Sequence, residues 1–206
     1  MTPFIVVVAG GTASGKSTIV LELCRVTGAL HLMHDRYYKD VYQPRGHNYD
    51  EPDALDTERL VADLSLLRAG QPADLPVYDF RTHRRQAQVD PTEPRPLIVV
   101  EGILTLCDSR VRELAHLKVY VDCPDDLRLA RRIRRDLKSR ARDLDEVLDQ
   151  YLETVRPMHQ VHVAPSRTWA DLVVSGESPV MSSVAAIRSE IQARGGPGAS
   201  EPLSAR

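Results

Sequence analysis

The stretch Gly10-Gly11-Thr12-Ala13-Ser14-Gly15-Lys16-Ser17 follows the pattern of a phosphate-binding loop: a glycine, four residues, then Gly-Lys-Ser. The apolar run 4–8 precedes it, and a helical pattern follows it. In such a strand–loop–helix unit, backbone N–H groups and the positive end of the helix dipole favour an anion at the loop. We therefore expect residues 10–18, ending at Thr18, to bind a nucleotide, with Lys16 on its β- and γ-phosphates and Ser17 on Mg²⁺. A glycine turn that only connects strand and helix is the alternative.

Length, charge and cysteine usage limit the class of protein. A chain of 206 residues fits one domain, and the net charge of −2 argues against a general nucleic-acid coat. The three cysteines, Cys24, Cys107 and Cys123, are far apart and lie beside apolar residues, which favours reduced, buried thiols in a cytoplasmic protein. The N-terminal apolar run is short and lacks a basic start, so we expect no signal peptide, and no stretch is long and apolar enough to span a bilayer.

Strand-like and helical patterns alternate along the chain. Strand-like runs lie at 3–8, 29–33, 97–100, 117–122 and 170–174, and helical patterns at 16–27, 57–68, 109–114, 124–138, 144–162 and 182–192. This alternation predicts an α/β fold, a doubly wound parallel sheet with helices on both faces, formed by residues 1–193. We expect Pro157 to kink or end its helix, and the apolar-poor tail 194–206 to be disordered.

Two long segments do not fit the alternation. Residues 34–54 are polar, aromatic and rich in turn residues, and residues 71–96 carry five prolines. A short strand-like piece at 75–80 and a basic run at 81–85 predict a small β-hairpin arm at about 71–90. Irregular segments of this length in a compact domain are usually functional.

Two carboxylates follow predicted strands at the edge where the phosphate loop lies. Glu101 ends the run 97–100 and is placed to hold Mg²⁺, although it could instead cap the following turn. Asp35 follows the run 29–33 and could accept the proton of an attacking hydroxyl, although a turn residue is the alternative. Ser17, Glu101 and Asp35 are thus the candidate Mg²⁺ ligands. Neither Asn-Lys nor Thr-Lys occurs, so a guanine site has no support.

The predicted helix at 124–138 is rich in arginine. Its basic residues, with those that follow, are Arg128, Arg131, Arg132, Arg134, Arg135, Lys138, Arg140 and Arg142. A solvated basic face is the usual meaning of such a run. Near a phosphate loop, however, planar guanidinium groups neutralise a transferring phosphoryl group, which predicts an arginine-rich lid at about 124–150. Binding of RNA is a weaker interpretation because aromatic residues make up only 5% of the chain and are not interleaved with these arginines.

Several motifs resemble those of the uridine kinase (uridine–cytidine kinase) family, from Ile5 to about Gly176. Besides the loop, they are Asp35 with Tyr37-Tyr38-Lys39, Asn48-Tyr49-Asp50-Glu51-Pro52-Asp53-Ala54-Leu55-Asp56, Leu75-Pro76-Val77-Tyr78-Asp79-Phe80 with His83, Val100-Glu101-Gly102-Ile103-Leu104, Asp122, Arg128-Leu129-Ala130-Arg131-Arg132, Arg135-Asp136 and Gln150-Tyr151. The second and third of these blocks are far more specific than the loop. Phosphoribulokinase and pantothenate kinase share the fold but do not have these two blocks together.

The resemblance implies an activity and a set of site residues. It implies that ATP, with Mg²⁺, phosphorylates uridine or cytidine at the 5′-hydroxyl, in a cytoplasmic homo-oligomer that is usually a tetramer, without nucleic-acid or membrane partners. Asp35 would be the general base, and Lys16, Arg132 and Arg135 would stabilise the transferring charge. The implied nucleoside contacts are Asp50 at the ribose, Tyr78, Phe80 and His83 around the pyrimidine, and Ile103, Arg132, Arg142 and Gln150 nearby.

The chain departs from the family pattern at two places. Ser139-Arg140-Ala141-Arg142 stands where the family often has Glu-Arg-Gly-Arg, and the missing glycine is expected to stiffen the lid hinge. His34 stands where Gln is common. His159 and His162 lie three apart, but without a third ligand a surface or subunit contact is favoured over a metal site. A kinase for another small hydroxyl substrate is one remaining alternative, and a phosphate-loop switch or nucleic-acid-dependent ATPase is the other.

Overall fold

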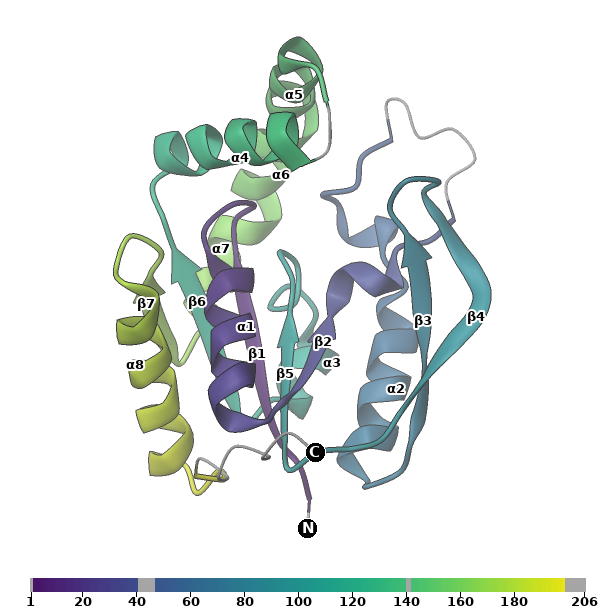
Figure 1. Cartoon of the computed structure of the whole chain (residues 1–206), viewed down its shortest axis with the longest axis vertical. Coiled ribbons are helices and arrows are strands. Elements are labelled where there is room, and N and C mark those ends of the chain that lie inside the picture. Colours follow the sequence, from purple (N-terminus) through teal and green to yellow (C-terminus); the bar gives the residue numbers. More distant parts are fainter. Residues whose placement is uncertain (1, 41–46, 140–141, 199–206) are drawn as a thin grey trace.

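A five-stranded parallel sheet forms the centre of the molecule (Figure 1). The computed structural model describes residues 2–40, 47–139 and 142–198. The strands are β1 (Phe4–Gly10), β2 (Leu30–Met33), β5 (Leu97–Glu101), β6 (Leu117–Asp122) and β7 (Leu172–Ser175), in the order β2-β5-β1-β6-β7. β1 pairs with β5 and β6 on either side and is buried along its whole length. The prediction of a doubly wound parallel sheet is confirmed.

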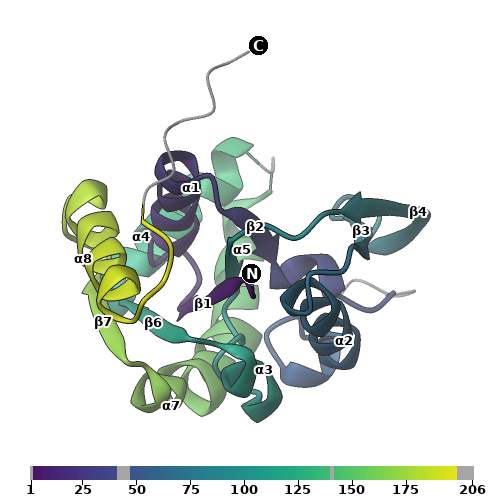
Figure 2. The same ribbon diagram turned by 90° about the horizontal axis from the view of Figure 1, so that it is seen from below.

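Helices cover both faces of this sheet (Figure 2). On one face, α1 (Lys16–Thr27) and α8 (Val180–Ala193) pack against the even-numbered side chains of β1. On the other, α2 (Thr57–Arg68) and α3 (Ser109–Leu114) pack against the odd-numbered ones. Because successive strand residues point to opposite faces, an almost wholly apolar β1 can serve two cores at once.

Side chains cap two of these helices but not the one that follows the loop. Asp56 accepts a hydrogen bond from the Arg59 backbone N–H (3.2 Å) at the start of α2, and Asp108 accepts one from Arg110 N–H (2.8 Å) at the start of α3. No side chain caps α1, whose preceding residue is Gly15 with φ +98°. The N–H groups at the start of α1 therefore remain available to an anion.

The predicted arm is a two-stranded antiparallel hairpin of β3 (Ala73–Asp79) and β4 (Arg84–Thr92). Arg85 donates hydrogen bonds to the carbonyls of Tyr37 (2.9 Å) and Tyr38 (3.0 Å) and forms an ion pair with Asp56 (2.9 Å). These contacts hold the arm against the segment that follows β2, which contains short 3₁₀ turns at His34–Tyr37 and Pro52–Ala54.

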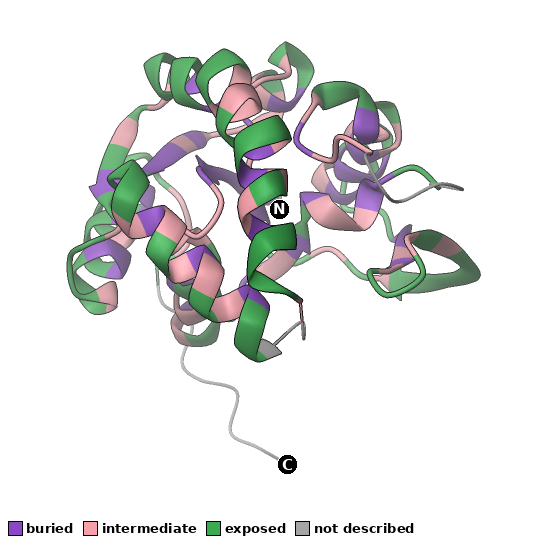
Figure 3. Ribbon diagram, turned by 90° about the horizontal axis from the view of Figure 1, so that it is seen from above, coloured by how far each residue is buried: buried purple, intermediate pink, exposed green. Residues whose placement is uncertain are grey.

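The arginine-rich helix α4 (Asp125–Ser139) lies over the carboxyl ends of the strands and is followed by α5 (Leu144–Gln150). The chain then continues helically through π turns at Tyr151–Val155 and His159–Val163, with α6 (Arg156–Met158), α7 (Ala164–Ser166) and a 3₁₀ turn at Arg167–Trp169. Seen from above, these helices carry exposed and intermediate positions, with buried positions recurring along the face toward the sheet (Figure 3).

Pro157 does not end this helix, contrary to one of the two expected outcomes. Each π turn ends two residues before a proline, Pro157 or Pro165. A proline lacks an N–H and crowds the carbonyl four residues earlier. In the π turn, the Arg156 N–H bonds the carbonyl of Tyr151 five residues earlier, which relieves this crowding without stopping the helix.

In the described part of the chain, no helix has the length and apolar character needed to cross a membrane.

Candidate active site

The phosphate loop joins β1 to α1 with a backbone that tolerates little substitution. Gly10, Ala13 and Gly15 all have positive φ angles (150°, 58° and 98°). A Cβ on Gly10 would lie 2.6 Å from the Val121 carbonyl oxygen, and one on Gly11 would lie 2.6 Å from the Arg128 guanidinium. The glycines of the motif are thus required by backbone conformation at Gly10 and Gly15 and by close packing at Gly10 and Gly11.

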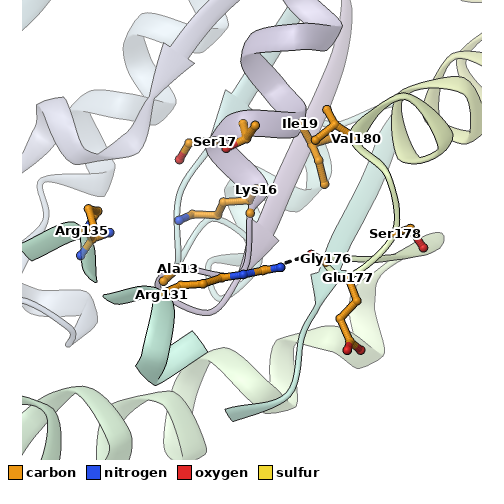
Figure 4. Close-up of a pocket in the computed structure, with 12 residues that line it drawn as sticks. Ala13, Lys16, Ser17, Ile19, Arg131, Arg135, Gly176, Glu177, Ser178 and Val180 are labelled. Carbon is orange, nitrogen blue, oxygen red and sulfur yellow. Dashed lines mark hydrogen bonds between the residues drawn. The ribbon is translucent and has the colours of Figure 1, made fainter. Parts of the chain in front are cut away.

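A pocket of about 440 Å³ opens beside the loop (Figure 4). It is lined by Ala13, Gly15, Lys16, Ser17, Thr18, Ile19, Arg131, Arg135, Gly176, Glu177, Ser178 and Val180. Arg131 donates a hydrogen bond to the Gly176 carbonyl (2.9 Å) and so connects α4 to the loop between β7 and α8. Three cationic side chains next to an uncapped helix start suit a polyphosphate ligand.

Glu101 ends β5 with its carboxylate near Lys16 and Ser17. It is buried, and the His31 Nε2 lies 3.5 Å from its Oε1. Burial raises the pKa of Glu101, but the nearby His31 imidazole, the charge of Lys16 and the Ser17 hydroxyl outweigh burial, so the pKa is lowered and the group stays ionised. Its Oε2 is buried without a hydrogen-bond partner. An ionised, incompletely bonded carboxylate beside the Ser17 hydroxyl is a donor set that fits Mg²⁺, whose other ligands are commonly water and phosphate oxygens.

Asp35 and Asp50 come from the segment between β2 and α2. Asp35 lies in the turn His34–Tyr37 directly after β2, and Asp50 is buried. Burial raises the pKa of Asp50; the charges of Arg132 and Lys16 lower it, and that of Asp35 raises it further. These electrostatic interactions mean that the four charged groups named from the sequence share one region above the loop.

Two arginines meet at Gln150. Arg132 donates hydrogen bonds to the Thr12 hydroxyl in the loop (3.2 Å) and to the Gln150 Oε1 (2.9 Å). Arg142 donates to the same oxygen at 2.6 Å. The structure therefore brings Arg132, Arg142 and Gln150 together over the phosphate loop, while Arg135 lines the pocket next to it.

The predicted pyrimidine contacts belong to a larger cluster of rings. Tyr78 contacts Phe80 (ring centroids 5.2 Å) and Tyr38 (5.6 Å), and Tyr49 contacts Tyr38 (5.6 Å) and His83 (5.0 Å). The hydroxyls of Tyr49 and Tyr78 are buried without partners. Burial raises the pKa of Tyr49, and burial with Tyr49 and Asp40 nearby raises the pKa of Tyr78 to about 12, so both hydroxyls are neutral.

The amino-acid sequence is similar to those of known kinases. The family model described as the Phosphoribulokinase / Uridine kinase family matches residues 5–182. The chain belongs to this family. A protein named uridine kinase from Chloroflexus aggregans is 46% identical over 182 residues, with 84% of this chain and 87% of that protein covered. A protein of the same name from Latilactobacillus sakei is 41% identical over 179 residues, with 84% and 85% covered.

Solved structures agree on the fold. A kinase from Silicibacter sp., named for a fructose transport system, superposes with a TM-score of 0.66 at 19% identity, covering 84% of this chain and 90% of that one. A structure described as a possible uridine kinase from Bacillus stearothermophilus gives a TM-score of 0.53 at 20% identity, covering 84% and 89%. At these identities the similarity concerns the kinase fold alone.

The ring cluster contains two residues that are not among the expected site residues. Tyr38 and Tyr49 lie within the sequence motifs, and their positions close to Asp35 and Asp50 are the signal that points to them. Ile103 packs partly buried against the core next to β5.

No metal-binding group of three His, Cys, Asp or Glu residues occurs among the described residues, which leaves His159 and His162 without support as a metal site. The departure at Arg140-Ala141 lies outside the described residues.

Proposed function

We propose that this protein is a nucleoside kinase that transfers the γ-phosphoryl group of ATP to the 5′-hydroxyl of uridine or cytidine. The observation that carries the proposal is the position of Asp50. This buried carboxylate interacts electrostatically with Asp35, Lys16 and Arg132, and Tyr49, one residue before it, belongs to the ring cluster. A phosphate site, a candidate base and a diol-binding carboxylate thus adjoin a site for a flat ring.

The donor site follows from the loop and the pocket. Backbone N–H groups at the start of α1 bind the phosphates, and Lys16 contacts the β- and γ-phosphates. The outer part of the pocket, with Thr18, Arg131 and Val180, accommodates the donor base. Ser17 and Glu101 would hold Mg²⁺, which would neutralise part of the phosphate charge when bound.

The acceptor site lies between the arm and the segment after β2. Asp50 accepts hydrogen bonds from the two ribose hydroxyls, because an ionised carboxylate has two acceptor oxygens for a vicinal diol. Tyr78 and Phe80 stack on the pyrimidine, and His83 bonds its edge as donor or acceptor, which suits both a uracil carbonyl and a cytosine amine.

In the transfer step, Asp35 takes the proton of the 5′-hydroxyl. The oxygen attacks the γ-phosphorus in line, a new P–O bond forms, and the bond to the β-phosphate oxygen breaks to release ADP. Arg132 and Arg135 neutralise the charge on the transferring group. Closure of the arginine-rich lid would exclude water and limit hydrolysis of ATP.

The proposal is tested by ADP release from MgATP with uridine, cytidine, adenosine, ribulose 5-phosphate, pantothenate or RNA added separately. Stimulation by uridine or cytidine, and by none of the others, is the expected result. Stimulation by ribulose 5-phosphate or pantothenate would assign another kinase activity of the same fold, and stimulation by RNA would assign a nucleic-acid-dependent ATPase. Either result would overturn the proposal.

Two further features are proposals from the family resemblance. A homotetramer is checked by light scattering on the purified protein, and a cytoplasmic location by fractionation of expressing cells. Mass corresponding to a monomer, or recovery with the membrane fraction, would contradict them.

A further inference from the structure

Asp136 on α4 is fully buried among arginines of the lid. Its Oδ1 lies 2.8 Å from the Arg135 Nε, and its Oδ2 lies 3.7 Å from the Arg132 Nε and 3.9 Å from the Arg142 Nη1. Its backbone carbonyl also accepts a hydrogen bond from the Arg142 N–H (3.3 Å). One carboxylate therefore contacts guanidinium groups both on α4 and on the segment that leads into α5.

The same guanidinium groups reach the phosphate and acceptor sites. Arg132 donates to Thr12 of the phosphate loop, and Arg135 lines the pocket beside Lys16. Arg142 meets Arg132 again at the Gln150 oxygen. Asp136 itself is 0% exposed and does not line the pocket, so the arginines that it contacts connect it to the site.

Like charges this close need a common anion to stay together. Arg132 is buried, and Arg135 and Arg142 lie near enough to oppose its charge, while Asp136 and Asp50 favour it. Repulsion between partly buried cations is much stronger than in water, and each arginine has enough rotamer freedom to turn into solvent. Removal of the Asp136 charge would therefore let the guanidinium groups leave their positions, including that of Arg132 against Thr12 of the loop.

We propose that Asp136 is a positioning residue for phosphoryl transfer, which holds Arg132, Arg135 and Arg142 in the arrangement that stabilises the transferring group. The inference rests on the proposed function. Loss of the Asp136 charge should slow the chemical step, because misplacing a charge-stabilising group by about 1 Å can lower a rate by about a hundredfold. Binding of the MgATP anion, in contrast, depends on total positive charge, which the loss of Asp136 increases.

The test compares Asp136→Asn, Asp136→Glu and Asp171→Asn with the wild type, in steady-state kinetics with MgATP and uridine and in thermal melts. Asp171 is the matched control, since it pairs with Lys118 (3.2 Å) and Arg194 (3.3 Å) just before β7, at the edge of the sheet away from the site. For Asp136→Asn we expect kcat per folded enzyme to fall about ten- to a hundredfold while KM for MgATP stays unchanged or falls. Asp136→Glu keeps the charge but displaces it, and should lower kcat less; Asp171→Asn should lower only the melting temperature.

Two results for Asp136→Asn would overturn the inference. One is a wild-type kcat per folded enzyme, and the other is a rise in KM for MgATP by the same factor as the fall in kcat. If Asp136→Asn does not fold, Asp136→Glu decides: a lowered kcat with unchanged KM supports positioning, while wild-type kcat, or failure of this variant to fold as well, makes the role structural and overturns it. If the wild type turns over MgATP without response to any nucleoside, the proposed function has failed. The inference is then judged from the same comparison in basal ATP hydrolysis, which depends on the same arginines.

Discussion

Asp35 and Asp50 are close enough to interact but have different surroundings. Asp35 is half-buried in the turn after β2, whereas Asp50 is buried with a raised pKa. A general base has to reach a hydroxyl and release its proton afterwards, which suits the less buried group, while a buried carboxylate suits a fixed diol. The two acids can thus divide base and binding roles between them.

Asp35→Asn should lower kcat by about two to four orders of magnitude, because the amide keeps the shape but cannot accept the proton. KM for MgATP should change little, since the loop and Lys16 are untouched. Steady-state kinetics with uridine and a MgATP binding isotherm measure the two effects. Near-wild-type kcat in this variant would show that another group accepts the proton.

Gly11 is limited by packing rather than by its backbone angle. A Cβ there would lie 2.6 Å from the Arg128 Nη1 and 2.8 Å from its Cζ, and Arg128 is itself buried. Gly11→Ala should therefore displace the loop, lower stability by about 1–3 kcal/mol and weaken MgATP binding. Gly70→Ala is the control, because a Cβ there meets nothing within 4 Å and only the positive φ of +78° is strained. Equal MgATP affinity in the two variants would contradict this account of the loop.

At the scale of elements, the hairpin arm brings residues distant in sequence to the proposed acceptor site. His83 lies in the turn between β3 and β4 with φ +55°, and its ring contacts Tyr49 from the other segment (5.0 Å). Ring contacts across the two segments, together with Arg85, fix the arm against the segment after β2.

His83→Asn should weaken use of the pyrimidine while basal ATP hydrolysis stays the same. Asparagine tolerates the left-handed conformation of this turn, so the change removes the imidazole rather than the turn. We expect KM for uridine to rise about tenfold or more, as when a buried hydrogen-bonding group loses its partner. A parallel loss of nucleoside-dependent and basal activity would instead assign His83 a role in folding.

Much of the fold and of the candidate site was predictable, since the apolar runs and the loop motif depend on local pattern. The strands at 97–100 and 117–122 and the helix at 16–27 agree with β5, β6 and α1 to within a residue. The π turns before Pro157 and Pro165 were not predictable, because they depend on how the helix packs rather than on propensity. Nor could spacing place Tyr49 against His83, or Asp136 between Arg135 and Arg142, since tertiary structure creates those contacts.

At the scale of the whole molecule, a buried histidine connects stability to pH. His34 is fully buried against Gly102, and burial lowers its pKa from 6.5 to about 4, only partly opposed by Asp108. Between these two values the unfolded chain binds a proton that the folded chain does not, so the free energy of unfolding falls as the pH is lowered from about 6.5 toward about 4. His159, whose pKa is also lowered to about 4, acts in the same direction.

His34→Gln should make the stability less dependent on pH in that window, because the amide does not titrate. Urea unfolding of wild type and variant at pH 7.5 and pH 5 measures the difference. Asp56 and Asp108, whose pKa values are also lowered, are present in both proteins, so their contribution to the pH dependence cancels in the comparison. Equal losses of stability in the two proteins would show that His34 is protonated or solvated in the folded state.

The central claim is that one site places the 5′-hydroxyl of a pyrimidine ribonucleoside against the γ-phosphate of ATP. Its most direct test is the product formed from uridine and MgATP, identified by chromatography and ³¹P NMR, with Asp35→Asn as the control. We predict uridine 5′-monophosphate and ADP in equal amounts from the wild type and almost none from the variant. Inorganic phosphate without a nucleotide product, or phosphate attached at another hydroxyl, would contradict the account.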